Sequence, residues 1–270
     1  MTSVEKKSIK IGCIGLGNMG GAIAGGLAAQ GYEWIFGYHP DVERCAEQCE
    51  KLNIQPAADL KEVGSCDIVL LAVKPYQLKG VLEKLTPFLG SKNCLVSVAA
   101  GISLTLLREW SATKCPVVRV MPNTPALVQR GAFALAWGAP APDVNRQQAI
   151  EKMFSCIGQV YLLDEKHFDT FGALIGAGPA YVFAFMEALI DAGVDQGLPR
   201  AQASAMVSDL LDGSIALQRA TKAHVTLLKE MVTSPGGVTI AGLNQFDKHG
   251  FRFAVIEAVE AAVQRSKKLV

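Results

Sequence analysis

The sequence predicts an α/β protein in two parts, a sheet domain with crossover helices over residues 1–163 and an all-helical domain over residues 164–270. Up to residue 163, short β-type runs alternate with runs of helical periodicity, as is typical of a parallel sheet. After Asp164, apolar residues recur at helical spacing and β-type runs almost disappear. A chain of 270 residues, half of them hydrophobic, is also long enough for two domains that each have a core.

The expected elements can be placed in order along the chain. In the first domain we expect strands at residues 9–16, 33–39, 66–73, 93–100 and 116–121, with helices at 18–30 and 41–52. In the second, helix breaks at residues 176–179, 197–200 and 235–237 separate five or six helices, of which the first two end near Ala192 and Ala220. Because no long Pro- or Ser-rich linker joins the domains, we expect them to pack closely around a ligand-binding cleft.

Composition favours a small-molecule partner. The formal net charge is +1 and 19% of the residues are charged, so no nucleic-acid-binding surface is indicated. The first ten residues lack an apolar signal segment, and the most apolar later run, residues 181–194, is interrupted by Glu187 and Asp191. We therefore expect a cytoplasmic protein without a membrane partner.

The seven cysteines are scattered singly, without a Cys-x-x-Cys pair. This pattern predicts reduced, mostly buried thiols. Cys45 and Cys49 lie four residues apart on a predicted helix, but no nearby His or Cys completes a ligand set, so we expect no metal site.

A glycine motif follows the first predicted strand. Gly15, Gly17 and Gly20 form G-x-G-x-x-G between that strand and the helix at residues 18–30. The first glycine permits a tight turn, the second lets the backbone approach a pyrophosphate, and the third allows close helix–strand packing. The phosphates would lie at the helix N-terminus. A dinucleotide site is therefore predicted here.

The end of the second predicted strand bears on the choice of cofactor. NAD-binding proteins usually place an acidic residue there for the ribose 2′-hydroxyl, but this chain has Tyr38-His39-Pro40. Asp41 is more simply interpreted as the cap of the next helix. NADPH is therefore favoured, with NADH possible. His39 and Arg44 could contact a 2′-phosphate, or could be an exposed imidazole and a solvated helix cation.

Two more loops follow strand ends at the same predicted edge of the sheet. They contain Ala72, Val73, Lys74 and Pro75, and Ala99, Ala100 and Gly101; small residues there would let the dinucleotide pass close to the backbone. A turn with Asn123 follows the fifth strand, and it is either part of the site or simply a turn.

A second glycine-rich segment, Ser234-Pro235-Gly236-Gly237, precedes a predicted helix. Free backbone N–H groups at such a helix N-terminus attract an anion, and Ser234 and Thr239 add hydroxyl groups. We expect an anionic small substrate here. The alternative is a tight turn between helices with Ser234 as the cap.

The motifs GLGNMG, AVKP, SVAAG, MPNTPALV, GAGPAYVF, GLPRAQA and LKEMVTSPGGVTIAGL occur in this order over nearly the whole chain. In this combination the sequence resembles the Δ1-pyrroline-5-carboxylate reductases. The resemblance implies NAD(P)H-dependent reduction of pyrroline-5-carboxylate to L-proline, an N-terminal Rossmann domain and a helical dimerisation domain. It further implies homodimers that often assemble into larger rings such as decamers, with the substrate loop at the dimer interface.

The resemblance also implies roles for individual residues. The cofactor would contact Gly15, Leu16, Gly17, Asn18, Met19, Gly20, Ala72, Val73, Lys74, Pro75, Ala99, Ala100 and Asn123. The substrate would contact Ser234, Gly236, Gly237 and Thr239, with Thr239 as the catalytic residue that donates a hydrogen bond to the imine nitrogen. The chain departs from the family where Ile175 and Ala177 replace frequent hydroxyl residues, where Val225-Thr226 follow His224, and where Val238 stands in the signature.

Two other functions are weighed against this one. A β-hydroxyacid dehydrogenase has a similar start and a helical second domain, but its catalytic lysine would fall at Val182, which cannot act as an acid or base. A non-enzymatic NADPH-sensing protein would bind the cofactor without turnover. Turnover assays distinguish these possibilities.

Overall fold

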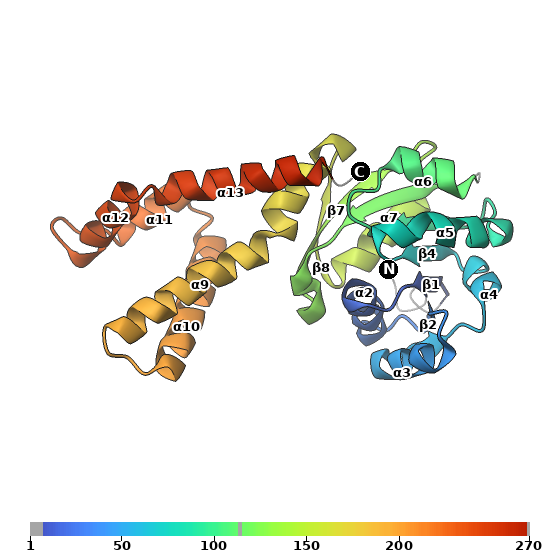
Figure 1. Cartoon of the computed structure of the whole chain (residues 1–270), viewed down its shortest axis with the longest axis horizontal. Coiled ribbons are helices and arrows are strands. Elements are labelled where there is room, and N and C mark those ends of the chain that lie inside the picture. The colour runs from blue at the N-terminus through green and yellow to red at the C-terminus, as the bar shows by residue number, and fades with distance from the viewer. Residues whose placement is uncertain (1–7, 113–114, 269–270) are drawn as a thin grey trace. The chain divides into compact units, whose positions relative to one another are not determined.

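A computed structural model of the chain describes residues 8–112 and 115–268. It divides into two compact units, one of residues up to Ala177 together with those from Val263 onward, and one of residues Gly178–Ala262 (Figure 1). The first contains the sheet and the second is helical, as the sequence predicts. Each unit is described separately below.

The sheet has eight strands in the order β3-β2-β1-β4-β5-β6-β7-β8. The strands are β1 (Lys10–Ile14), β2 (Trp34–Tyr38), β3 (Gln55–Pro56), β4 (Ile68–Leu71), β5 (Cys94–Ser97), β6 (Val117–Met121), β7 (Gly131–Trp137) and β8 (Gly158–Leu162). The five predicted strands are confirmed as β1, β2, β4, β5 and β6, and all of them pair in parallel.

Three strands were not predicted, and β7 reverses direction. It pairs antiparallel with β6, with Val120 opposite Leu135, and β8 then pairs parallel with β7. The connection between β6 and β7 contains a short 3₁₀ segment, Thr124–Val128, and is shorter than the dozen or so residues that a parallel crossover needs. The length of this connection therefore accounts for the reversal.

Helices cover both faces of the sheet. Buried residues of α2 (Asn18–Ala29), α3 (Val42–Leu52) and α7 (Val144–Ser155) pack on one face. Buried residues of α4 (Leu60–Gly64), α5 (Pro75–Leu85), α6 (Leu104–Ser111) and α8 (Phe168–Phe171) pack on the other. Strand residues alternate accordingly: Leu70 faces the first layer, whereas Val69 and Leu71 face the second. The carboxyl ends of β1, β2 and β4 are thereby held at one edge.

A partly buried ion pair joins β6 to the end of the sheet unit. Arg119, 7% exposed, donates to Glu165 at 2.8 Å, and its guanidinium lies 4.8 Å from the centre of the Phe168 ring. The same carboxylate oxygen accepts from the Leu104 N–H at the start of α6, at 2.7 Å. Residues 165–168, where the chain leaves the sheet, are thereby fixed.

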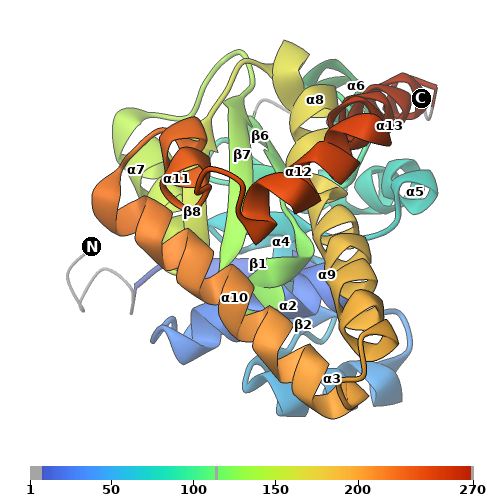
Figure 2. The same ribbon diagram turned by 90° about the vertical axis from the view of Figure 1, so that its left-hand side faces the viewer.

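The helical unit contains α9 (Gly178–Asp195), α10 (Arg200–Thr221), α11 (Val225–Met231), α12 (Val238–Lys248) and most of α13 (Phe251–Ser266). These helices match the predicted breaks, and Figure 2 shows α9 and α10 as a hairpin joined at residues 196–199. At the far end of α13, in the sheet unit, the Ser266 hydroxyl donates to Asp169 of α8 at 2.7 Å.

The helical unit buries little of its own apolar surface. Among its described residues, Ala203 and Val207 are the buried hydrophobic ones. Large side chains remain exposed on every helix, among them Phe183, Met206, Leu227, Val238 and Phe253. The continuous helical stretch Glu165–Asp195 is also long and apolar enough to cross a membrane, by length and composition alone. A surface of this kind requires a partner, whether protein or lipid.

The cysteines are mostly buried, as predicted. All seven are free, six are buried and Cys156 is partly exposed. Burial raises the pKa of the Cys13, Cys66 and Cys94 thiols to about 12, from an unperturbed value of 9.0. Folding therefore favours the neutral thiols.

Because of these buried thiols, we expect the free energy of unfolding to fall at alkaline pH. The unfolded chain ionises them from about pH 9, whereas the folded chain keeps them neutral up to about pH 12. The contribution of these thiols to the free energy of unfolding should therefore stay constant below about pH 9. Above pH 9 it should fall by roughly 1.4 kcal/mol per thiol for each pH unit. Urea unfolding under reducing conditions checks this, and Cys94→Ala should show a shallower fall. An equal slope for both proteins would contradict the prediction.

Candidate active site

The glycine turn after β1 gives each of its three glycines a different surrounding. Gly15 has φ +94°, and a Cβ there would lie 2.8 Å from the carbonyl group of Ala72. A Cβ on Gly20 would meet the Gly15 carbonyl oxygen, whereas one on Gly17 would meet nothing within 4 Å. Gly15 and Gly20 thus permit the turn and the close packing that the sequence predicts, and Gly17 faces open space. Phosphate binding by this turn stays a prediction.

The N-terminus of α2 lies directly behind this turn. Gly17 is its N-cap, no side chain caps it, and its first turn contains no acidic residue. The first N–H groups of a helix have no partner within the helix. These groups and the helix dipole favour an anion at this position.

A cavity of about 510 Å³ opens at the carboxyl ends of β1, β2 and β4. It brings together seven of the predicted cofactor residues, Gly15, Leu16, Gly17, His39, Ala72, Val73 and Lys74. It also includes residues that the sequence did not single out, notably Tyr38, Gln48, Gln77 and Val81. Asn18, Met19, Gly20, Pro75, Ala99, Ala100 and Asn123 are not among its lining residues.

The predicted cap role of Asp41 is confirmed. Its carboxylate accepts the Arg44 backbone N–H at 3.1 Å as the N-cap of α3. The Asp41 N–H donates in turn to Nδ1 of His39 at 3.1 Å. An accepting Nδ1 places the proton of the neutral imidazole on Nε2, which leaves an N–H donor on the other side of the ring. His39 and Arg44 both line the cavity.

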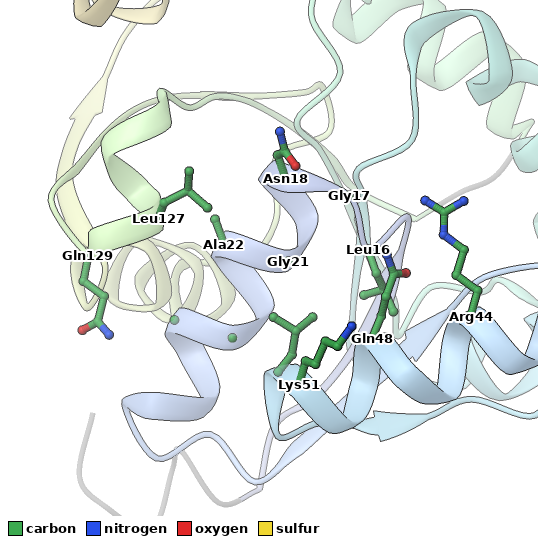
Figure 3. A pocket seen from close by; sticks show the side chains of 13 residues that line it. Leu16, Gly17, Asn18, Gly21, Ala22, Arg44, Gln48, Lys51, Leu127 and Gln129 are labelled. Atoms are coloured by element: carbon green, nitrogen blue, oxygen red, sulfur yellow. The ribbon is translucent and has the colours of Figure 1, made fainter.

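A second cavity of about 580 Å³ lies between α2, α3 and the segment Thr124–Val128 (Figure 3). Its walls are the glycine-rich face of α2, the side chains of Arg44, Gln48 and Lys51, and Leu127 with Gln129. Asn18 lines this cavity, and Arg44 and Gln48 line both. The buried Oε1 of Gln48 has no hydrogen-bond partner among the described residues. Together, the two cavities place a run of polar and cationic groups of α3 beside the glycine turn.

The other predicted strand-end residues lie close to the sheet edge. Ala99 is buried and Ala100 is exposed, followed by Gly101 with φ +77°. Asn123 is 9% exposed, and both ends of its amide are bonded within the protein. Its Oδ1 accepts from the Ala132 N–H at 2.8 Å, and its Nδ2 donates to the Ile175 carbonyl at 3.3 Å.

In the helical unit, the Ser-Pro-Gly-Gly segment leads into α12. Gly236 has φ +69°, and Gly237 is the N-cap of α12 without a side-chain cap. Ser234 therefore does not cap α12, although the tight turn of the alternative is present, with the Gly237 N–H donating to the Ser234 carbonyl at 3.1 Å. A Cβ on Gly237 would meet the Ser234 hydroxyl, which would have to rotate away. The N-terminal N–H groups of α12 remain open to an anion.

Thr239 lies in the first turn of α12 and is partly exposed. Its hydroxyl makes no hydrogen bond to any described residue. By contrast, the hydroxyl of Thr233 donates to the Lys229 carbonyl at 2.7 Å. Thr239 therefore has a hydroxyl available to a ligand, next to free backbone N–H groups.

Known proteins resemble this chain over nearly its whole length. Residues 165–269 match the family model for pyrroline-5-carboxylate reductase dimerisation, and residues 10–101 match that for NADP oxidoreductase, coenzyme F420-dependent. The pyrroline-5-carboxylate reductase of Arabidopsis thaliana is 37% identical over 98% of this chain and 97% of its own length. That of Escherichia coli is 38% identical, over 96% and 98%. This chain belongs to the pyrroline-5-carboxylate reductase family.

Solved structures agree with this assignment. The Plasmodium falciparum pyrroline carboxylate reductase with NADP bound has a TM-score of 0.87 and 34% identity, and covers 97% of this chain and 98% of its own. The Coxiella burnetii pyrroline-5-carboxylate reductase has a TM-score of 0.90 and 32% identity, over 97% and 99%. The predicted fold class, a Rossmann domain followed by a helical dimerisation domain, is confirmed.

Membership of the family also explains the exposed apolar surface. The chain is an NAD(P)H-dependent oxidoreductase that uses NADP. Its helical unit is the family's dimerisation domain, so the chain forms a homo-oligomer. A second copy of the chain is therefore the partner that the poorly buried helices α9–α13 require.

Proposed function

We propose that NADPH binds along residues 15–20 of this chain and that the substrate carboxylate binds at the N-terminus of α12. The reaction is the NAD(P)H-dependent reduction of 1-pyrroline-5-carboxylate to L-proline, the last step of proline biosynthesis. The observation that supports these positions best is the pairing of an uncapped helix N-terminus with the unbonded Thr239 hydroxyl. One group suits a carboxylate and the other suits the imine nitrogen of the same small molecule.

The fit of the cofactor rests on the glycine turn. A side chain at Gly15 or Gly20 would collide with backbone, and the open side of Gly17 leaves room for a pyrophosphate beside the N–H groups of α2. Ala72, Val73 and Lys74 would line the other side of the nucleotide. Leu16, Asn18, Met19, Pro75, Ala99, Ala100 and Asn123 complete the proposed cofactor site.

The residues of the chain act in this mechanism by position and by hydrogen bonding. When bound, NADPH supplies the hydride that reduces the imine carbon. Gly236 and Gly237 let the backbone approach the carboxylate, and Ser234 contributes a hydroxyl. Thr239 donates a hydrogen bond to the nitrogen of a neutral imine, which makes the neighbouring carbon electrophilic, and its oxygen accepts from the N–H of an imine that binds protonated. Since a cyclic imine can be protonated by water before it binds, the site requires positioning more than a strong general acid.

Several finer features are part of the same proposal. The boundary between the domains lies between residues 163 and 164, and the substrate loop of one subunit completes the site of another. The dimers assemble further, as rings such as decamers, and act in the cytoplasm on small molecules without nucleic-acid or membrane partners. NADH serves as a weaker alternative to NADPH.

His39 and Arg44 account for the preference between NADPH and NADH. Both line the nucleotide cavity, whereas the Asp41 carboxylate is bonded to the Arg44 N–H in the helix cap. A guanidinium and an imidazole N–H suit a 2′-phosphate, and an occupied carboxylate does not compete for it. Arg44→Ala is therefore expected to raise KM for NADPH about tenfold, with KM for NADH changed less than twofold.

Steady-state kinetics with both cofactors test this assignment. The matched control is Lys51→Ala, which removes another cation from the same helix; Lys51 lines the second cavity and not the nucleotide cavity. Equal weakening of NADPH and NADH by Arg44→Ala would assign Arg44 a role unrelated to the 2′-phosphate.

The proposed reaction is tested by NADPH oxidation, followed by absorbance, with pyrroline-5-carboxylate as substrate. A 3-hydroxyacid with NADP⁺ is the comparison, because the dehydrogenase alternative requires its oxidation. Fast imine-dependent oxidation supports the proposal. NADPH binding without turnover would instead favour the sensing protein, and hydroxyacid oxidation would overturn the argument from Val182.

A further inference from the structure

The second cavity, of about 580 Å³, lies beside the proposed nucleotide site, and most of its lining residues have no role there. Its volume is within the range of small-molecule sites. From the glycine turn the cavity continues along α2 and α3, away from the strand ends, to Gly25 and Lys51. Figure 3 shows α3 on one side of α2 and Leu127 with Gln129 on the other, so α2 forms the floor of this cavity.

The described lining of this cavity carries positive charge and hydrogen-bond donors but no carboxylate. Arg44 and Lys51 lie about two turns apart on α3, with the Gln48 amide between them. Seven residues of helix span about 10 Å, so both long side chains can reach one anionic group near Gln48. The three glutamates of α3 are not among the lining residues. Such a lining favours an anion, and a phosphate in particular, since a guanidinium can donate two parallel hydrogen bonds to it.

Gln48 has an amide that the protein itself leaves unsatisfied. Its Oε1 is buried without a hydrogen-bond partner, and its Nε2 makes no hydrogen bond to any described residue. Buried polar atoms without a partner are rare in native proteins, and each requires an explanation such as a bound water, an ion or a functional role. Because no bond holds the Nε2 group, it is available to donate to an anion where the two cavities meet.

Gly21 lies in the interior of α2 and lines the cavity. Glycine is less stable than alanine inside a helix, so a glycine there needs a reason such as close packing. Packing explains Gly25, where a Cβ would lie 2.9 Å from Cδ2 of Leu52. On Gly21, a Cβ would lie 3.4 Å from the Leu16 carbonyl oxygen and 3.7 Å from Leu52, which are ordinary contacts. The fold therefore has room for alanine at residue 21, and the glycine leaves the floor of the cavity open.

We propose that the second cavity binds a phosphate-bearing small molecule, whose phosphate lies between Arg44 and Lys51 and whose less polar part contacts Leu52 and Leu127. Because Arg44 also lines the nucleotide cavity, the occupant competes with NADPH, which carries a 2′-phosphate, and not with NADH. Binding to the cavity depends on the lining residues alone, whereas the competition rests on the proposed assignment of Arg44 to the 2′-phosphate.

Calorimetric titration of the cofactor-free protein tests the binding, with inorganic phosphate, ribose 5-phosphate and AMP as probes. We expect AMP to bind at least about fivefold more tightly than inorganic phosphate, because its nucleoside contacts the apolar walls. Ribose 5-phosphate shows whether a sugar phosphate is sufficient. Lys51→Ala should weaken AMP binding about five- to tenfold, and Gly21→Ala at least about threefold, with a thermal midpoint no lower than that of the native protein.

The variants also separate this cavity from the nucleotide site, because Lys51 and Gly21 line the second cavity and not the nucleotide cavity. Lys61→Ala is the matched control: it removes a lysine of α4 that lines neither cavity, and AMP affinity should stay within about twofold. Equal AMP affinity in the native protein, Lys51→Ala and Gly21→Ala would overturn the inference, as would no binding of any probe at millimolar concentration. If Gly21→Ala is destabilised, Lys51→Ala decides alone, since it changes an exposed side chain.

Steady-state kinetics with pyrroline-5-carboxylate test the competition. AMP at ten times its dissociation constant should raise KM for NADPH about tenfold and change KM for NADH less than about twofold. In Lys51→Ala the same AMP concentration should have a smaller effect. An equal rise of KM for both cofactors would overturn the link through Arg44. If the native protein reduces no pyrroline-5-carboxylate, the assigned reaction fails, and the dependence of AMP binding on Lys51 decides the inference separately.

Discussion

Replacement of Thr239 by valine is expected to lower kcat about 10- to 100-fold while the affinity for NADPH stays within twofold. Valine keeps the shape of threonine and removes the hydroxyl, which makes no hydrogen bond within the described part of the protein. A hydrogen bond from a charged, protonated imine N–H to the Thr239 oxygen contributes roughly 1.5–3 kcal/mol, which corresponds to this range of rate. The loss should not be larger, because a protonated imine can arrive already activated. Stopped-flow measurement of NADPH oxidation at saturating substrate gives the rate directly.

Two other variants define what a change at Thr239 means. Thr239→Ser retains the hydroxyl and should recover most of the rate. Thr233→Val is the matched control, since that hydroxyl is bonded to the Lys229 carbonyl one turn earlier in α11. If Thr233→Val and Thr239→Val lower kcat equally, the effect belongs to the stability of this segment and not to a bond with substrate.

Substitution of Gly17 by alanine is expected to weaken NADPH binding roughly 10- to 100-fold without loss of stability. A Cβ at this position meets no protein atom within 4 Å, so the folded protein accepts it. The same methyl group projects where the pyrophosphate must approach the N-terminus of α2, and a misplaced methyl in a packed contact costs about 1–3 kcal/mol. Isothermal titration with NADPH and a thermal melt of the free protein measure the two quantities.

Gly90→Ala provides the control for Gly17→Ala. Gly90 also faces open space, but it precedes β5 and therefore lies toward the amino ends of the parallel strands, opposite the nucleotide cavity. The Gly90→Ala substitution should leave NADPH binding unchanged. Gly20→Ala gives the opposite result from Gly17→Ala, because its Cβ meets the Gly15 carbonyl and the turn itself must shift. Normal NADPH affinity in Gly17→Ala would show that the pyrophosphate lies elsewhere.

The sequence predicts the first sheet strands and the helix breaks well because each has a strong local signal. Buried parallel strands appear as short apolar runs, and the breaks carry Gly or Pro. Strands β7 and β8 were missed, although residues 131–137 form a β-type run. Their pairing depends on the length of the connection after β6 and on contacts distant in sequence, which no local pattern contains.

Some residues of the candidate site could likewise be predicted from local sequence, and others could not. Gly15, Gly17 and Gly20 are predictable because backbone geometry alone demands glycine or open space there. Tyr38 and Gln48 enter the nucleotide cavity through the pairing of β2 with β1 and the packing of α3, so the sequence offered no comparable signal for them. Asn123 was singled out for its place after a strand, yet its two bonds within the protein become visible only in three dimensions.

The most direct test of the account follows a labelled hydride. NADPH carrying deuterium at nicotinamide C4, on the face that is transferred, is incubated with pyrroline-5-carboxylate and the purified homo-oligomer, and the product is analysed by mass spectrometry and NMR. We expect L-proline with deuterium on Cδ, formed in equal amount to the NADPH consumed, and a slower but identical outcome with Thr239→Val. Consumption of NADPH without deuterated proline, or no consumption by a protein that binds NADPH normally, would contradict the assigned reaction.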